Sequence, residues 1–206
     1  MLDFKEPESG TISVHKTIEH FGRLDVLVNN AGIFTRTPSN DPKTYETYRE
    51  VMSINTDATV SATLAAIEHL KASKGNLVFV SSVASVKPSE FGFAYCMSKA
   101  AMSMFAKCLA IELSPDVRVN IVSPGPVMTP IFGRVGLKMD QIHALMDSTT
   151  LVGRVGESEE IAASIGFLIS DEAKFIQGHE LFIDGGYMLK PSKHTVAQTV
   201  IDSRKA

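Results

Sequence analysis

Three side chains near the middle of the chain have the types and spacing needed to move a proton. Tyr95 and Lys99 lie four residues apart, and Ser82 lies thirteen residues before Tyr95. Positions i and i+4 share one face of a helix, so the phenol and the ammonium are expected side by side. An ammonium held there favours the phenolate and lowers its pKa from about 10. Such a phenol can exchange a proton with a carbinol or carbonyl oxygen, which a serine hydroxyl can also hold.

Each of these residues also has an ordinary structural interpretation. Tyr95 could be a half-buried helix tyrosine, Lys99 an exposed helix lysine, and Ser82 a loop serine beside Ser81. The pair alone is weak evidence, because Tyr and Lys lie four apart by chance on many solvated helices. The segments around the pair must therefore decide between the two interpretations.

Several segments, in one order along the chain, carry a resemblance to a known family. They are Leu24 to Gly32, which ends in Asn-Asn-Ala-Gly, then Asn55, Asn76 to Ser82, Ser123 to Thr129, Gly153 to Gly156, and Ile183 to Gly186. Together with the Tyr-x-x-x-Lys pair, these segments resemble the short-chain dehydrogenase/reductase family over roughly residues 11 to 190. The carrier-protein ketoacyl reductase and glucose-dehydrogenase-like branches are the most similar.

The resemblance implies a catalytic set of Asn55, Ser82, Tyr95 and Lys99. Tyr95 would be the general acid or base, Ser82 would steady the substrate oxygen, and Lys99 would lower the pKa of the phenol. The side chain of Asn55 would order a water that passes protons to the lysine. The residues expected to bind the cofactor are Asn30, Ala31, Gly32, Tyr95, Lys99, Pro124, Gly125, Val127 and Thr129.

One motif of the family does not occur in this sequence. The family opens with a strand, a Gly-x-x-x-Gly-x-Gly turn and a helix whose amino end holds the cofactor pyrophosphate, and no such turn is present. We therefore expect a Rossmann-type, doubly wound parallel α/β sheet that is truncated at the N-terminus and lacks its first βαβαβ portion. In that case the strand Leu24 to Val28 would be an apolar sheet edge, which invites association, and cofactor binding by this chain alone would be feeble.

Composition indicates one globular domain, which we expect to span residues 1–190 and to be followed by a mobile tail at 191–206. A net charge of −3 gives no basic surface for nucleic acid. No apolar run approaches the ~20 residues that span a bilayer, and no signal peptide is visible, so a cytoplasmic protein without membrane partners is expected. Cys96 and Cys108 are too far apart on one helix to pair, and the six histidines offer no metal-ligand spacing.

Hydrophobic periodicity predicts alternating helices and strands. Helices are expected at 13–22, from an N-cap at Asp41 to about Ser73, and at 93–113 and 157–170; strands are expected at 24–28, 77–80, 118–122 and 180–183. Such alternation favours a parallel sheet. Met128 to Leu151 would form a substrate lid, and Phe34, Phe91 and Phe93 would add apolar surface to the substrate site.

The expected activity is hydride transfer between NAD or NADP and a small secondary alcohol or ketone, by an enzyme that forms a homo-oligomer. The residue that selects NAD or NADP would lie in the absent second strand. A non-catalytic fragment or scaffold derived from such an enzyme is the alternative. The extended epimerase/dehydratase branch shares Tyr-x-x-x-Lys, but the short distance from Tyr95 to Asp184 disfavours it.

Overall fold

A computed structural model of the protein describes residues 3–6, 8–90, 92–131 and 149–190. Most of the expected lid, the expected tail at 191–206 and Phe91 lie outside the described residues. None of the helices in the described ranges is both long enough and apolar enough to cross a membrane.

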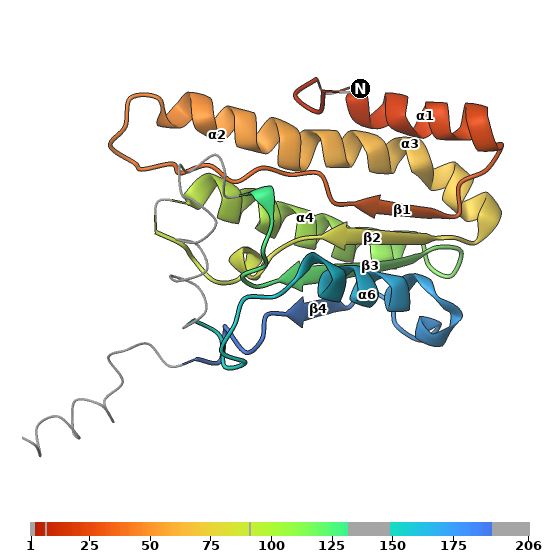
Figure 1. The fold of residues 1–206 in the computed structure, drawn as a ribbon. Coiled ribbons are helices and arrows are strands. Elements are labelled where there is room, and N and C mark those ends of the chain that lie inside the picture. The colour runs from red at the N-terminus through yellow and green to blue at the C-terminus, as the bar shows by residue number, and fades with distance from the viewer. Residues whose placement is uncertain (1–2, 7, 91, 132–148, 191–206) are drawn as a thin grey trace, which may run out of the picture.

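Four parallel strands form the sheet, and their spatial order follows the sequence (Figure 1). The strands are β1 (Val26–Asn29), β2 (Asn76–Val80), β3 (Arg118–Pro124) and β4 (Glu180–Ile183). β2 and β3 are the central strands and are almost fully buried. This suits the apolar run Leu77–Val80 of β2, whereas β3 also buries Asn120 and Ser123. The predicted parallel α/β sheet is confirmed, with strand bounds shifted by one or two residues.

Helices cover both faces of this sheet. On one face α1 (Ser9–Phe21), α3 (Ala58–Ser73) and α4 (Phe93–Glu112) pack over Leu77, Phe79, Val119 and Ile121. On the other face α6 (Ser158–Ile169) packs over Val78 and Val122. Successive strand residues alternate between the faces, so each central strand supplies both cores. The sheet is therefore doubly wound.

The long helix predicted from Asp41 is interrupted by a π-helical turn. It consists of α2 (Thr44–Met52), a π turn at Ser53–Asp57, and α3. The helix begins two residues later than predicted, with Lys43 instead of Asp41 at the N-cap. Asp41 caps a turn instead: its carboxylate accepts a hydrogen bond from the Lys43 N–H at 2.8 Å. The π turn matters for the site because it contains Asn55, and such turns often occur at functional sites.

Helical spacing alone does not decide which apolar side chains are buried. Phe21, Tyr45 and Leu64 are 71%, 70% and 58% exposed, respectively, whereas Leu70 is fully buried. Spacing by 3.6 residues assigns a side chain to a helix face, but only the packed helices decide which face is covered. The start of α1 was also placed four residues late. The predicted glycine stop at Gly22 is confirmed, with a φ of 74°.

β1 is the edge strand of the sheet formed by the described residues. Its only strand partner there is β2, with Leu27 opposite Leu77. The backbone groups on the other side of β1 therefore have no strand partner within the described ranges. This matches the sheet edge expected from the sequence.

Candidate active site

The candidate residues gather at the carboxyl ends of the strands. Asn30, Ala31 and Gly32 follow β1, Ser82 follows β2, and Gly125 follows β3. In a parallel sheet these ends meet at one edge, where ligands bind in open α/β folds. The first turns of α4 bring Tyr95 and Lys99 to the same edge. Tertiary structure thus unites segments that are far apart in the sequence.

The Ser82 hydroxyl lies beside the Tyr95 phenol, close enough to act on the pKa of that phenol. Ser82 also caps the short 3₁₀ turn Val83–Ser85, where its Oγ accepts from the Ala84 N–H at 3.1 Å. The neighbouring Ser81 is engaged further along α4, where its Oγ lies 2.8 Å from Ser103 Oγ and 3.1 Å from the Lys99 carbonyl. Of the two serines, Ser82 is the one that acts on Tyr95. Its catalytic role stays a prediction.

Burial raises the pKa of Tyr95 to about 12, although the hydrogen bond with Ser82 acts in the opposite direction. The ring of Phe34 packs edge-on against the Tyr95 ring, with centroids 5.2 Å apart. The pKa of this phenol thus shifts in the direction opposite to the expected one, because burial disfavours the phenolate. The expected role of Lys99 stays a prediction.

Lys99 is buried rather than an exposed helix lysine, with 3% of its surface accessible. Its Nζ donates a hydrogen bond to the Val80 carbonyl at 2.8 Å and lies 5.6 Å from the centroid of the Tyr95 ring. Burial lowers the pKa of Lys99 to about 8. The predicted proximity of the two side chains on one helix face is confirmed.

Asn55 is fully buried in the π turn and links two elements of the site. Its Oδ1 accepts from the Ile33 N–H at 2.8 Å, and its Nδ2 donates to the Ile33 carbonyl and to Ser98 Oγ, both at 3.0 Å. Both amide hydrogens are thus used by the protein, and a relay through this side chain would depend on the remaining Oδ1 lone pair. No local pattern marks Ile33 and Ser98 as the partners of Asn55, because each pairing joins segments more than twenty residues apart.

The segment after β1 leaves space beside the catalytic candidates. A Cβ on Gly32 would lie 3.3 Å from Asn55 Oδ1 and 3.5 Å from Lys99 Nζ. Glycine therefore keeps the path to the buried ammonium open, which fits a polyhydroxyl ligand such as a nucleotide ribose. Asn30 is exposed, and Ala31 is partly exposed beside it.

The residues expected to bind the cofactor after β3 have a different environment. A Cβ on Gly125 would lie 2.7 Å from Asp184 Cα, so this glycine permits close packing with the C-terminal segment. Val127 forms an isolated parallel bridge with Gly156. Pro124 is the last residue of β3, and Thr129 is partly exposed near the end of a described range. These contacts fix the backbone of the segment beside the site.

Phe93, which was expected in the substrate wall, stacks on Tyr48 of α2, with ring centroids 6.4 Å apart. It therefore joins two helices, while Phe34 is the aromatic residue that contacts Tyr95. Cys96 and Cys108 both lie on α4 and are free, as predicted.

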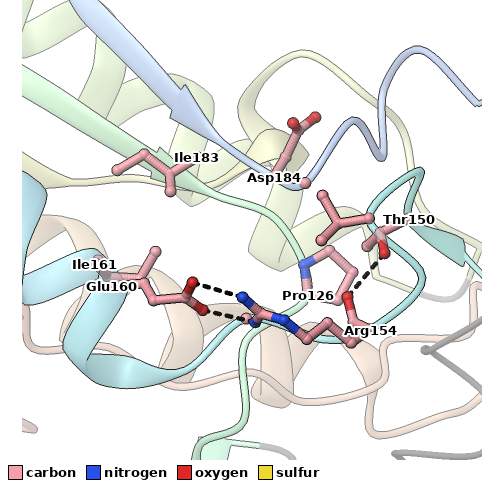
Figure 2. Close-up of a pocket in the computed structure, with 10 residues that line it drawn as sticks. Pro126, Thr150, Arg154, Glu160, Ile161, Ile183 and Asp184 are labelled. Atoms are coloured by element: carbon pink, nitrogen blue, oxygen red, sulfur yellow. Dashed lines mark hydrogen bonds and ion pairs between the residues drawn. The ribbon is translucent and has the colours of Figure 1, made fainter.

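A small cavity of about 90 Å³ lies apart from these residues (Figure 2). It is lined by Pro126, Thr150, Val152, Arg154, Gly156, Glu160, Ile161, Ile183, Asp184 and Gly185. Across it Arg154 forms a two-pronged ion pair with Glu160, with both N–O distances 2.8 Å. None of the four catalytic candidates lines this cavity, so it is not the candidate active site.

Comparison with known proteins identifies the family. A family model described as enoyl-(acyl carrier protein) reductase matches residues 1–188. Cyclopentanol dehydrogenase of Comamonas sp. is 38% identical over 188 residues, which are 90% of this chain and 74% of the relative. The chain belongs to the short-chain dehydrogenase/reductase (SDR) family.

Two further SDR comparisons extend this result. Trans-4-hydroxycyclohexanecarboxylate dehydrogenase of Sinomonas cyclohexanicum is 38% identical over 186 residues, covering 90% of this chain and 68% of the relative. The solved structure of ElxO with NADP bound has a TM-score of 0.80 and 26% identity, over 92% of this chain and 77% of that one. The fold predicted from the ordered motifs is thereby confirmed.

Proposed function

We propose that this SDR protein transfers hydride between NAD or NADP and a small secondary alcohol or ketone. The observation that carries the proposal is the placement of Ser82 beside Tyr95, at the carboxyl end of a parallel sheet and one helical turn from buried Lys99. Two relatives are named as dehydrogenases of cyclopentanol and of a hydroxycyclohexane carboxylate, which supports a cyclic secondary alcohol as substrate.

The proposed roles follow from the contacts of each side chain. Tyr95 is a neutral phenol at pH 7, the form that can donate a proton to a carbonyl oxygen, and Ser82 would hold that same oxygen. Asn55 would act as a positioning residue, because it ties the segment after β1 to α4. Phe34 would contact the substrate next to the reacting oxygen, since it packs on the Tyr95 ring.

The residues beside Gly32 fit a nicotinamide nucleotide. When bound, that cofactor would supply or accept the hydride. Lys99 would donate to its ribose hydroxyls, since the ammonium has three hydrogens and one is committed to Val80. Asn30, Ala31 and Gly32 would approach it from β1, and Pro124, Gly125, Val127 and Thr129 would approach from β3. The structure of ElxO with NADP bound supports this class of cofactor.

A homo-oligomer is also proposed, from an apolar stripe on the surface of α4. Met97, Met104 and Ile111 recur every seven residues and are 48%, 62% and 83% exposed. Residues spaced by seven share one helix face, so a second copy of the chain could cover all three.

The two free cysteines suit the reducing cytoplasm that we propose as the location.

The test is turnover of cyclopentanol with NAD⁺ or NADP⁺, followed by nicotinamide absorbance, in wild type and Tyr95→Phe. The kcat of the variant should fall by roughly 10²- to 10⁴-fold, which is the usual rate enhancement from general acid–base catalysis. Cofactor affinity, measured by fluorescence, should stay unchanged. Parental turnover in Tyr95→Phe would refute the role of Tyr95. Inactivity of the wild type with a panel of secondary alcohols and ketones would favour a scaffold instead.

A further inference from the structure

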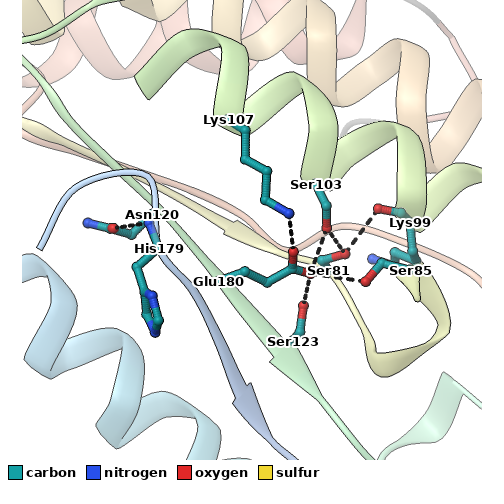
Figure 3. A network of polar contacts seen from close by, with 9 residues as sticks. All are labelled: Ser81, Ser85, Lys99, Ser103, Lys107, Asn120, Ser123, His179 and Glu180. Carbon is teal, nitrogen blue, oxygen red and sulfur yellow. Dashed lines mark hydrogen bonds and ion pairs between the residues drawn. The ribbon is translucent and has the colours of Figure 1, made fainter. Parts of the chain in front are cut away.

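A row of polar side chains on α4 extends beyond the candidate active site. Tyr95, Lys99, Ser103 and Lys107 follow one another at four-residue intervals along α4. The first two reach the candidate site, and the last two reach Glu180 at the start of β4 (Figure 3). One helix face thus connects the reacting groups to a carboxylate that comes from a distant segment.

Glu180 is a buried carboxylate with an unusual set of donors. Its side chain is 7% exposed. Oε1 accepts hydrogen bonds from Ser85, Ser103 and Ser123, at 3.0, 2.9 and 2.8 Å respectively. Oε2 accepts from Lys107 Nζ at 2.6 Å. Burial acts to raise the pKa of Glu180, but the bonds from Lys107 and the serines outweigh it and lower the pKa, so the group is ionised at pH 7.

Two of these serine hydroxyls lead directly to the candidate active site. Ser85 is the last residue of the 3₁₀ turn that Ser82 caps. Ser103 donates to Glu180, which leaves its oxygen able to accept from Ser81, the residue next to Ser82. Ser81 Oγ also lies 3.1 Å from the Lys99 carbonyl. Glu180 therefore holds the Ser82 turn from both sides and fastens it to α4, which carries Tyr95.

We infer that Glu180 is a positioning residue that sets where the Ser82 hydroxyl stands relative to Tyr95. The placement of Ser82 beside Tyr95 depends on two elements, the turn Val83–Ser85 and α4, and Glu180 is hydrogen-bonded to both. Hydrogen bonds to a charged acceptor are stronger and more directional than neutral ones. Small misplacements near the reacting atoms can lower rates by about 10², so a loose turn should reduce kcat without weakening cofactor binding. The inference rests on the proposed function.

The test separates the acceptor role of Glu180 from its contribution to stability. Glu180→Leu removes every acceptor, whereas Glu180→Gln keeps an oxygen for the serines and gives up only the ion pair with half-exposed Lys107. Ser85→Ala removes the link to the turn alone. Ser73→Ala is the matched control, because Ser73 Oγ donates to the Leu24 carbonyl at 2.7 Å on α3, remote from the site.

Two measurements are made on each variant: kcat for cyclopentanol with saturating cofactor, and hydrogen exchange of the amides at 81–87. We expect kcat to fall about tenfold or more in Glu180→Leu and several-fold in Ser85→Ala, with faster exchange at 81–87 and unchanged cofactor affinity. Glu180→Gln should stay within about threefold of wild type, and Ser73→Ala should match it in both measurements.

The inference would be overturned if Ser85→Ala and Glu180→Leu lost no more activity or protection than Ser73→Ala. It would also be overturned if Glu180→Gln were as impaired as Glu180→Leu. If Glu180→Leu does not fold, Ser85→Ala decides the question. If the wild type shows no turnover, the proposed function has failed. Hydrogen exchange at 81–87 in Ser85→Ala then tests separately whether Glu180 holds the turn in place.

Discussion

Replacing Lys99 by methionine should change how the stability of the fold depends on pH. The Lys99 ammonium is 3% exposed, and burial lowers its pKa from 10.5 to about 8. The hydrogen bond to the Val80 carbonyl does not remove this penalty, because a neutral amine can donate to the same oxygen. At neutral pH the folded protein therefore holds a charge that its surroundings disfavour. Methionine has a similar length and carries no charge.

The magnitude follows from the two pKa values of Lys99. A separation of about 2.5 between the unfolded and folded values, at about 1.4 kcal/mol for each pKa unit, gives roughly 3.5 kcal/mol. Between pH 8 and 10.5 the unfolded chain binds the proton that the folded chain has lost. Stability from this group therefore rises with pH in that window and is constant below it. Lys99→Met lacks this rise.

The assay is urea unfolding of wild type and Lys99→Met at several pH values from 7 to 10, in the absence of cofactor. The difference in unfolding free energy should move in favour of the wild type by about 2 to 3 kcal/mol across this range. Tyr95 begins to titrate only in the unfolded chain near pH 10, and it does so in both proteins. Lys16→Met on α1, where the lysine is exposed, is the control for the substitution. A difference that stays constant from pH 7 to 10 would refute the buried-charge argument.

Three other predictions concern the links and surfaces of the fold. Asn55→Ala should lower the unfolding free energy by about 2 to 4 kcal/mol in urea, because it removes the partner of the part-buried N–H and carbonyl of Ile33; a loss below 0.5 kcal/mol would contradict this. Met104→Glu should reduce the mass measured by light scattering if the α4 stripe forms the oligomer, and Lys16→Glu should not. Val26→Lys should suppress association of a 206-residue polypeptide through the edge of β1; unchanged association would exclude pairing through that edge.

Local sequence patterns were sufficient to predict the elements of the fold. The alternation of short apolar strands with amphipathic helices indicated a parallel sheet, and the structure confirmed it. Glu157 was predicted to open a helix, and it forms a capping box with Glu160 at the start of α6. These features depend on residues within a few positions of one another, so the physics that produces them is visible in the sequence.

The proximity of the catalytic candidates was predictable only in part. The four-residue spacing of Tyr95 and Lys99 fixes a common helix face. That Ser82 meets Tyr95 followed from the resemblance to the SDR family, because the two residues lie on different elements. The structure brings the two side chains together.

The sequence by itself determined which residue types lie at the carboxyl ends of the strands. Only the tertiary structure decided the pKa values of these residues and the hydrogen-bond partners that hold them in place. Burial, which depends on the packing of distant segments, gives Tyr95 a raised pKa and Lys99 a lowered one, contrary to the expected tuning of the phenol. The partners of Asn55 and Glu180 come from segments more than twenty residues away, so no local pattern marks them. Desolvation and long-range hydrogen bonds exist only once the chain has folded.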